Sequence, residues 1–106
     1  MLKGRVAVIT GAGNGLGRAY AVGMAAQGAS VVVNDLGTSF DGNGETHDAA
    51  DAVVRTIKQT GGSAVASYDS VATEDGAKNI IKTAIDKYGR VDILVNNAGV
   101  IRNNPV

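Results

Sequence analysis

The 106-residue sequence predicts an α/β fold in which short buried strands alternate with amphipathic helices. Short apolar runs rich in β-branched residues recur along the chain, and segments of helical length with one apolar face separate them. Glycines stand where these segments meet. Strands that alternate with helices pair in parallel through right-handed crossovers, so we expect a doubly wound sheet with the element order β-α-β-α-β-α-β.

The first unit is a strand, a helix and a second strand. Residues 5–10 form the first predicted strand, and the glycines that follow it end it. Apolar and small residues then recur at helical spacing from Leu16, and Gly28 can supply the left-handed residue that ends the helix. Residues 31–33 are three valines in a row, which is typical of a strand covered on both faces.

The second half continues the alternation through a loop, two helices and two strands. These are a loop over 36–47, a helix that ends at Gly61, a strand over 64–68, a helix from a Thr73 cap to Gly89, and a strand over 93–95. The helix after Thr73 has the clearest apolar face in the sequence, formed by Ala77, Ile80, Ile81, Ala84, Ile85 and Tyr88.

Composition excludes several classes of protein. The chain has 15 glycines without a G-x-y period, one proline, 44% apolar and 19% charged residues, which argues against collagen and against disorder. It has no cysteine, which excludes a disulfide scaffold. Its net charge is zero, so it lacks the excess of positive charge that non-specific binding of nucleic acid requires. The apolar run at 6–9 is too short for a signal sequence or a membrane span. We therefore expect one domain over 1–106 in a reducing compartment, most simply the cytoplasm.

The strongest functional motif is the glycine-rich segment between the first strand and the first helix. Glycines let backbone N–H groups approach a phosphate closely and permit positive φ angles, and the helix start adds its positive end. The strand–turn–helix context makes a tight turn without a ligand the weaker alternative. The predicted binding residues are Gly11, Gly13, Asn14, Gly15, Leu16 and Gly17.

Polar residues follow the later strands at the edge where a parallel sheet binds its ligand. Asp35 can accept hydrogen bonds from both ribose hydroxyls of an adenosine and would repel a 2′-phosphate, which favours NAD over NADP. Asp69 can accept from the adenine amino group. The paired amides and small residues at 96–99 can brace neighbouring strands and let a ligand pass the backbone. Ordinary turns at the strand ends remain the alternative for each of these sites.

No metal site is predicted. Residues 41–45 have the alternating oxygen pattern of a calcium loop, but Thr46 stands where glycine is needed and Ala52 where glutamate is needed. His47 is the sole histidine and has no partner in the sequence pattern.

These motifs resemble the N-terminal half of the short-chain dehydrogenase/reductase family. The glycine motif at 10–17 matches the family's coenzyme loop, and the residues at 96–99 match its second signature. The resemblance implies a partial Rossmann-type sheet of strand order 3-2-1-4 that binds NAD, with further contacts from Ser70, Asn97, Ala98 and Gly99. Residues 33–37 and 66–71 are similar to the 3-hydroxyacyl-CoA dehydrogenase region of multifunctional β-oxidation enzymes.

One departure from the family pattern limits what this chain can do alone. The family carries out catalysis with a Tyr and a Lys four residues later. In this sequence the three tyrosines are followed four positions later by Met24, Ala72 and Asp92. We therefore expect coenzyme binding without turnover, and no catalytic residue is assigned. The strand at 93–95 would be an apolar sheet edge, which favours self-association or pairing with a partner chain. A non-catalytic nucleotide-binding or interaction module, or a half-enzyme completed by another chain, remain the alternatives.

Overall fold

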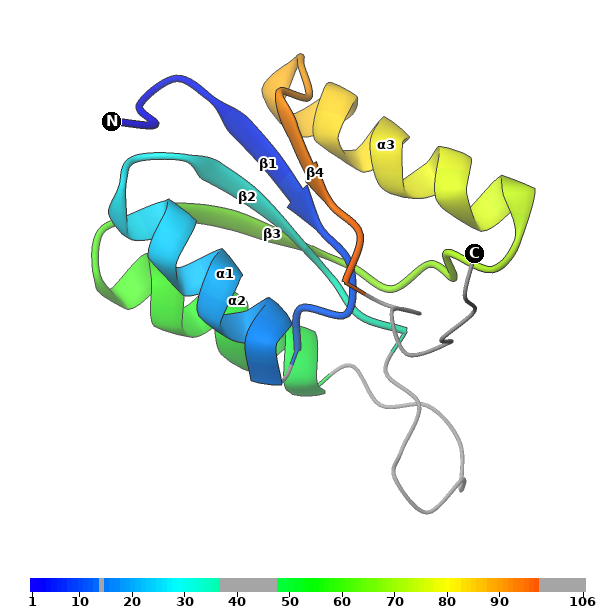
Figure 1. Cartoon of the computed structure of the whole chain (residues 1–106), viewed down its shortest axis with the longest axis horizontal. Helices are drawn as coiled ribbons and strands as arrows, with labels where there is room; N and C mark the ends of the chain where they lie inside the picture. The colour runs from blue at the N-terminus through cyan, green and yellow to red at the C-terminus, as the bar shows by residue number, and fades with distance from the viewer. Residues whose placement is uncertain (14, 37–47, 98–106) are drawn as a thin grey trace, which may run out of the picture.

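The computed structural model describes residues 1–13, 15–36 and 48–97, in which strands and helices alternate as expected (Figure 1). The elements are β1 (Val6–Ile9), α1 (Gly15–Ala26), β2 (Ser30–Asn34), α2 (Asp48–Gln59), β3 (Ser63–Ser67), α3 (Glu74–Tyr88) and β4 (Ile93–Val95). Their bounds lie close to those predicted from the sequence. The predicted loop lies outside the described residues beyond Leu36.

The four strands form one parallel sheet in the order β3-β2-β1-β4, which confirms the doubly wound prediction. Helices α1 and α2 cover one face of the sheet and α3 covers the other (Figure 1). The chain runs outward from β1 to β3 and then returns through α3 to β4. The direction of winding therefore reverses between β1 and β4, and open parallel sheets bind ligands in the crevice at such a reversal.

The two central strands are buried on both faces because their side chains alternate between two cores. Val31 and Val33 pack in the core beneath α1 and α2, together with Val53 and Ile57. Val32 points to the opposite core, which lies beneath α3. The uninterrupted valines of β2 thus follow from a sheet with helices on both sides.

The apolar face of α3 is buried only in part. Ile80 is 2% exposed and Ala84 is fully buried, whereas Ile81 is 37% and Ile85 46% exposed. The reason is geometric, because α3 packs mainly against β1 and β2. Leu94, on β4, is consequently 58% exposed.

The start of β4 is fixed to β1 by one carboxylate. Oδ2 of Asp92 accepts a hydrogen bond from the Val6 N–H at 2.9 Å, and Oδ1 accepts from the Arg90 guanidinium at 2.8 Å. The hydrogen bond from Arg90, followed by that from Val6, holds the pKa of the Asp92 carboxyl below its usual range. The last strand therefore joins the sheet through a charged group as well as through its backbone.

Candidate nucleotide-binding site

The glycine-rich loop lies at the carboxyl end of β1 and leads directly into α1. Gly11 has φ +62° and Gly15 has φ +55°, a left-handed region that disfavours side chains. Between them the Ala12 N–H donates to the Asn34 carbonyl at 2.8 Å. The loop is thereby attached to the end of β2 as well as to β1.

Two further glycines of the loop are required for close packing. A Cβ on Gly17 would overlap the carbonyl oxygen of Gly11 and lie 2.7 Å from Nδ2 of Asn97. A Cβ on Gly13 would lie 2.6 Å from Oδ2 of Asp35. These positions exclude side chains because backbone and functional groups already occupy the space.

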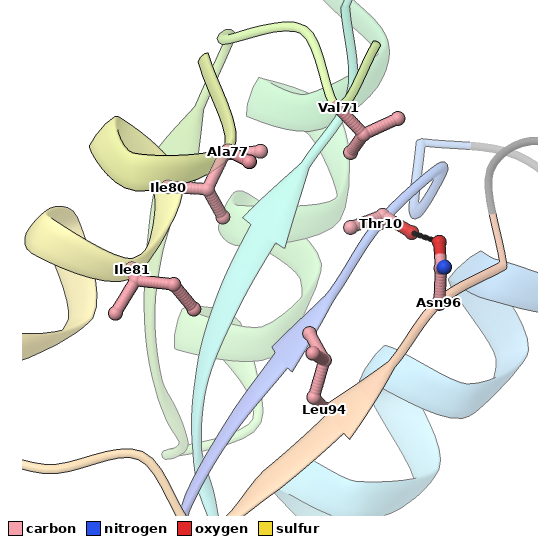
Figure 2. A pocket seen from close by; sticks show the side chains of 7 residues that line it. All are labelled: Thr10, Val71, Ala77, Ile80, Ile81, Leu94 and Asn96. Carbon is pink, nitrogen blue, oxygen red and sulfur yellow. Dashed lines mark hydrogen bonds between the residues drawn. The ribbon is translucent and has the colours of Figure 1, made fainter. Parts of the chain in front are cut away.

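The paired asparagines after β4 brace the glycine loop. Nδ2 of Asn97 donates to the Gly11 carbonyl at 3.2 Å. Oγ1 of Thr10 donates to Oδ1 of Asn96 at 3.3 Å, the contact drawn in Figure 2. The bracing role expected of these amides is present, and it connects the ends of β1 and β4.

A pocket of about 280 Å³ opens at the carboxyl ends of β1, β2 and β3. It is lined by Gly11, Asn34, Asp35, Leu36, Asp69, Ser70, Val71 and Ala72. Four predicted site residues therefore meet in one hollow, which is near the lower end of the sizes usual for ligand pockets. Two of them are acidic, and none of the lining residues within the described part of the chain is a lysine or arginine.

The other predicted site residues lie outside this lining. Gly13 in the loop and Gly17 in α1 are both buried, Gly15 begins α1, and the Leu16 side chain is 60% exposed. Asn97 is not among the lining residues, but its side chain donates to the carbonyl of Gly11, which is one of them. Asn14, Ala98 and Gly99 lie outside the described residues.

Asp35 is held in place by the glycine loop. Its Oδ2 accepts a hydrogen bond from the Gly13 N–H at 2.9 Å. This backbone donor orients the carboxylate at the end of β2, so the acidic group and the loop form one structural unit.

Sequence reasoning missed Asn34, which is 1% exposed and lines the pocket. Its signal was a polar residue directly after three buried valines. A buried amide in such a position needs hydrogen-bond partners, and their location indicates what it organises.

A second pocket, of about 180 Å³, lies on the α3 side of the sheet. Figure 2 shows Ile80 and Ile81 on α3, Leu94 on β4 and Val71 on the segment before α3 around this hollow. Its lining is mainly apolar, and Val71 also lines the first pocket. The two hollows are therefore neighbours that share one side chain.

The described part of the chain contains no cluster of three or more His, Cys, Asp or Glu side chains that could hold a metal ion. Nor does any helix in 1–13, 15–36 or 48–97 have the length and apolarity needed to cross a membrane.

The strand reversal, the glycine loop at β1 and the acidic residue at the end of β2 together define a Rossmann-type nucleotide-binding fold. The short chain dehydrogenase family matches residues 5–106, and the chain belongs to this family. The resemblance found in the sequence is thus confirmed.

Individual relatives agree with this assignment. A putative short-chain type dehydrogenase/reductase of Mycobacterium tuberculosis is 60% identical over 96% of this chain, which spans 36% of that protein. The peroxisomal multifunctional enzyme type 2 of Mus musculus is 54% identical over 94% of the chain, which spans 13% of that protein. The chain thus spans about a third or less of these relatives, and the likeness to multifunctional enzymes is also confirmed.

Solved structures support the fold. A short chain dehydrogenase from Mycobacterium avium superposes with a TM-score of 0.83 at 46% identity, covering 98% of this chain and 39% of that one. A 7α-hydroxysteroid dehydrogenase in complex with NADH has a TM-score of 0.79 at 43% identity, covering 90% of this chain and 34% of that one.

Proposed function

We propose that this chain is the coenzyme-binding region of an NAD-dependent short-chain oxidoreductase. The observation that carries the proposal is the pocket at the carboxyl ends of the strands, where Asp35 is bonded to the glycine loop and Asp69 lines the same hollow. The neighbour bound to NADH supports a nicotinamide dinucleotide as the ligand class.

The residues present fit the adenosine diphosphate part of such a coenzyme. The start of α1 at Gly15 offers the first backbone N–H groups of the helix to the phosphates, and a side chain at Gly13 or Gly17 would have no room. Asp35 would bind the ribose hydroxyls and Asp69 the adenine amino group, beside Ser70. The remaining predicted contacts would follow the coenzyme along the loop and beyond β4, at Asn14, Gly15, Leu16, Asn97, Ala98 and Gly99.

The charge of the pocket favours NAD over NADP. Asp35 and Asp69 line it, and the lining residues that the structure describes include no lysine or arginine, so a 2′-phosphate would meet like charge. This preference depends on Asp35, because its carboxylate stands where the ribose hydroxyls would bind.

For the whole protein we propose interconversion of a hydroxyl and a ketone, with a 3-hydroxyacyl-CoA as the substrate class that the multifunctional relatives favour. The bound coenzyme would accept or supply the hydride. This chain lacks the Tyr-x-x-x-Lys pair of the family, so we expect no turnover from it alone. The lack of cysteine suits a reducing compartment such as the cytoplasm, although several relatives carry peroxisomal names.

Calorimetric titration of the chain with AMP, NAD and NADP tests the binding proposal. We expect saturable binding of AMP and NAD and weaker binding of NADP. Asp35→Asn keeps an oxygen that can accept from Gly13 but removes the charge, so NAD should bind more weakly and the penalty for NADP should shrink. Asp86→Asn, in an exposed pair with Lys82, is the matched control and should change neither.

Two results would contradict the proposal. If titration with AMP or NAD at millimolar concentration produces no heat, the proposal of a nucleotide site is wrong. If the ratio of NAD to NADP affinity is unchanged in Asp35→Asn, the assignment of Asp35 to the ribose hydroxyls is wrong.

A second candidate function is an interaction module, which the exposed apolar groups favour. Ile81, Ile85 and Leu94 are 37%, 46% and 58% exposed, and β4 is the last strand of the described sheet. Pairing of β4 with another chain would cover these groups and supply the missing hydrogen bonds of an edge strand. Measurement of the oligomeric state tests this alternative.

A further inference from the structure

Asn34 places a side-chain amide directly after the three buried valines of β2. It is 1% exposed, at the end of β2. Its Nδ2 lies 3.0 Å from the Asp69 carbonyl oxygen, 3.2 Å from Oγ of Ser67 and 3.3 Å from the Ser67 carbonyl oxygen. Burial of an amide is unfavourable without such partners, so these bonds decide whether the position tolerates asparagine.

The same residue contacts every segment that forms the nucleotide pocket. Its carbonyl accepts from the Ala12 N–H of the glycine loop at 2.8 Å, and its amide donates to the segment after β3. The Ser67 carbonyl has another donor, the Asp35 N–H at 3.0 Å. β3 is thus bonded to the end of β2 by the backbone as well. Among the described residues, the bond to the Asp69 carbonyl is the one by which the Asn34 side chain attaches the segment after β3.

The pocket wall formed by residues 69–72 is attached at its other end to α3. A Cβ on Gly76 would overlap the Ser70 carbonyl oxygen, so helix and wall are in close contact there. The Ala72 N–H also donates to Oγ of Ser70 at 3.0 Å. The wall thus has one attachment at α3 and a second at Asn34, and the second lies beside Asp69.

We propose that Asn34 is a positioning residue of the nucleotide pocket. Its amide holds the 69–72 wall against the end of β2, so that the carboxylates of Asp35 and Asp69 line one pocket. The inference rests on the proposed function, in which Asp69 recognises the base. Loss of the amide should consequently impair recognition of the base more than binding of the ribose and phosphate.

Comparison of AMP with IMP separates these two effects in the chain. IMP has a carbonyl where AMP has an amino group, so a correctly placed Asp69 carboxylate favours AMP. Asn34→Leu keeps a similar volume and removes the donor. We expect the AMP-to-IMP affinity ratio to fall by roughly fivefold, the size expected for one net hydrogen bond. IMP affinity should change little.

Ser67→Ala is the matched control, because it removes one acceptor of the same amide from a residue that is 3% exposed. The bond to Asp69 remains, so the ratio should remain as well. An equal loss of AMP and IMP affinity in Asn34→Leu would show general damage and would overturn the proposal. So would an unchanged ratio, or the same fall in Ser67→Ala. If Asn34→Leu does not fold, Asn34→Thr takes its place, because its hydroxyl is too short to replace the amide.

Amide hydrogen exchange in the ligand-free chain gives a second readout. The N–H groups of residues 69–72 should exchange faster in the Asn34 variant than in the original chain, with no increase across α1. Unchanged exchange would overturn the positioning role. If the original chain binds neither AMP nor NAD, the proposed function fails, and the exchange data still decide whether Asn34 holds the wall.

Discussion

Substitution of Gly17 by alanine should destabilise the fold, although alanine normally favours a helix. The added Cβ would overlap the Gly11 carbonyl oxygen, lie 2.9 Å from its carbon and lie 2.7 Å from Nδ2 of Asn97. Backbone atoms cannot rotate away, so we expect an overpacking cost of about 1–3 kcal/mol. Loss of the 3.2 Å bond from Asn97 to Gly11 adds about 1 kcal/mol. The helix preference of alanine offsets about 1 kcal/mol, which leaves a net loss of about 1–3 kcal/mol.

Gly23 provides the matched control in the same helix. Nothing lies within 4 Å of a Cβ built there, so Gly23→Ala should stabilise the protein by about 0.5–1 kcal/mol. Thermal unfolding followed by circular dichroism measures both variants, with about 4–8 °C per kcal/mol for a domain of this size. Gly17→Ala should melt below the original protein and Gly23→Ala above it. A Gly17→Ala variant that melts at or above the original protein would refute the close-packing argument.

Three further predictions concern the start of β4, the cap of α3 and the exposed side of β4. Arg90 and the Val6 N–H lower the pKa of Asp92, so the folded state favours the charged carboxylate. That stability is present above the ordinary aspartate pKa of 3.8 and is lost as the pH falls through the lowered pKa of the folded state. Asp92→Asn should therefore flatten the acid limb of a pH-dependent melt, and an unaltered limb would contradict this. Thr73→Ala removes the hydroxyl that caps α3 and should cost about 1 kcal/mol in urea unfolding, whereas no change in the midpoint would show that the cap is not needed. Light scattering should detect self-association that Leu94→Lys abolishes; a monomer at high concentration before the substitution would refute the interaction proposal.

The backbone arrangement could be predicted from the sequence because local and global signals agree. The valines of β2, the Thr73 cap and the left-handed Gly89 each fit the element in which they lie. The buried stripe of α2, for example Val53 and Ile57, also follows helical spacing. Such signals repeat along the chain, so an error at one position does not change the fold.

The side-chain geometry of the site could be predicted only in part. Asp35 and Asp69 were placed at the correct edge because strand ends meet there, but the bond from Gly13 to Asp35 depends on the path of the loop. Asn34 could not be identified as a pocket residue, since its partners come from a different strand. The exposure of Ile81 was equally hidden, because periodicity shows which residues share a face and not how far the neighbouring sheet extends.

The pairing of β1 with β4 has a consequence for the order of folding. The bonds from Val6 to Asp92 and from Asn97 to Gly11 each join residues 86 positions apart. Contacts of this separation carry a loop-closure cost that neighbouring strands avoid, so β1 can pair with β2 well before β4 arrives. During synthesis the glycine loop emerges from the ribosome before Asn97, so it lacks its brace until Asn97 has been made. Within the described fold, the nucleotide pocket should therefore reach its final form later than the β1–β2 pair.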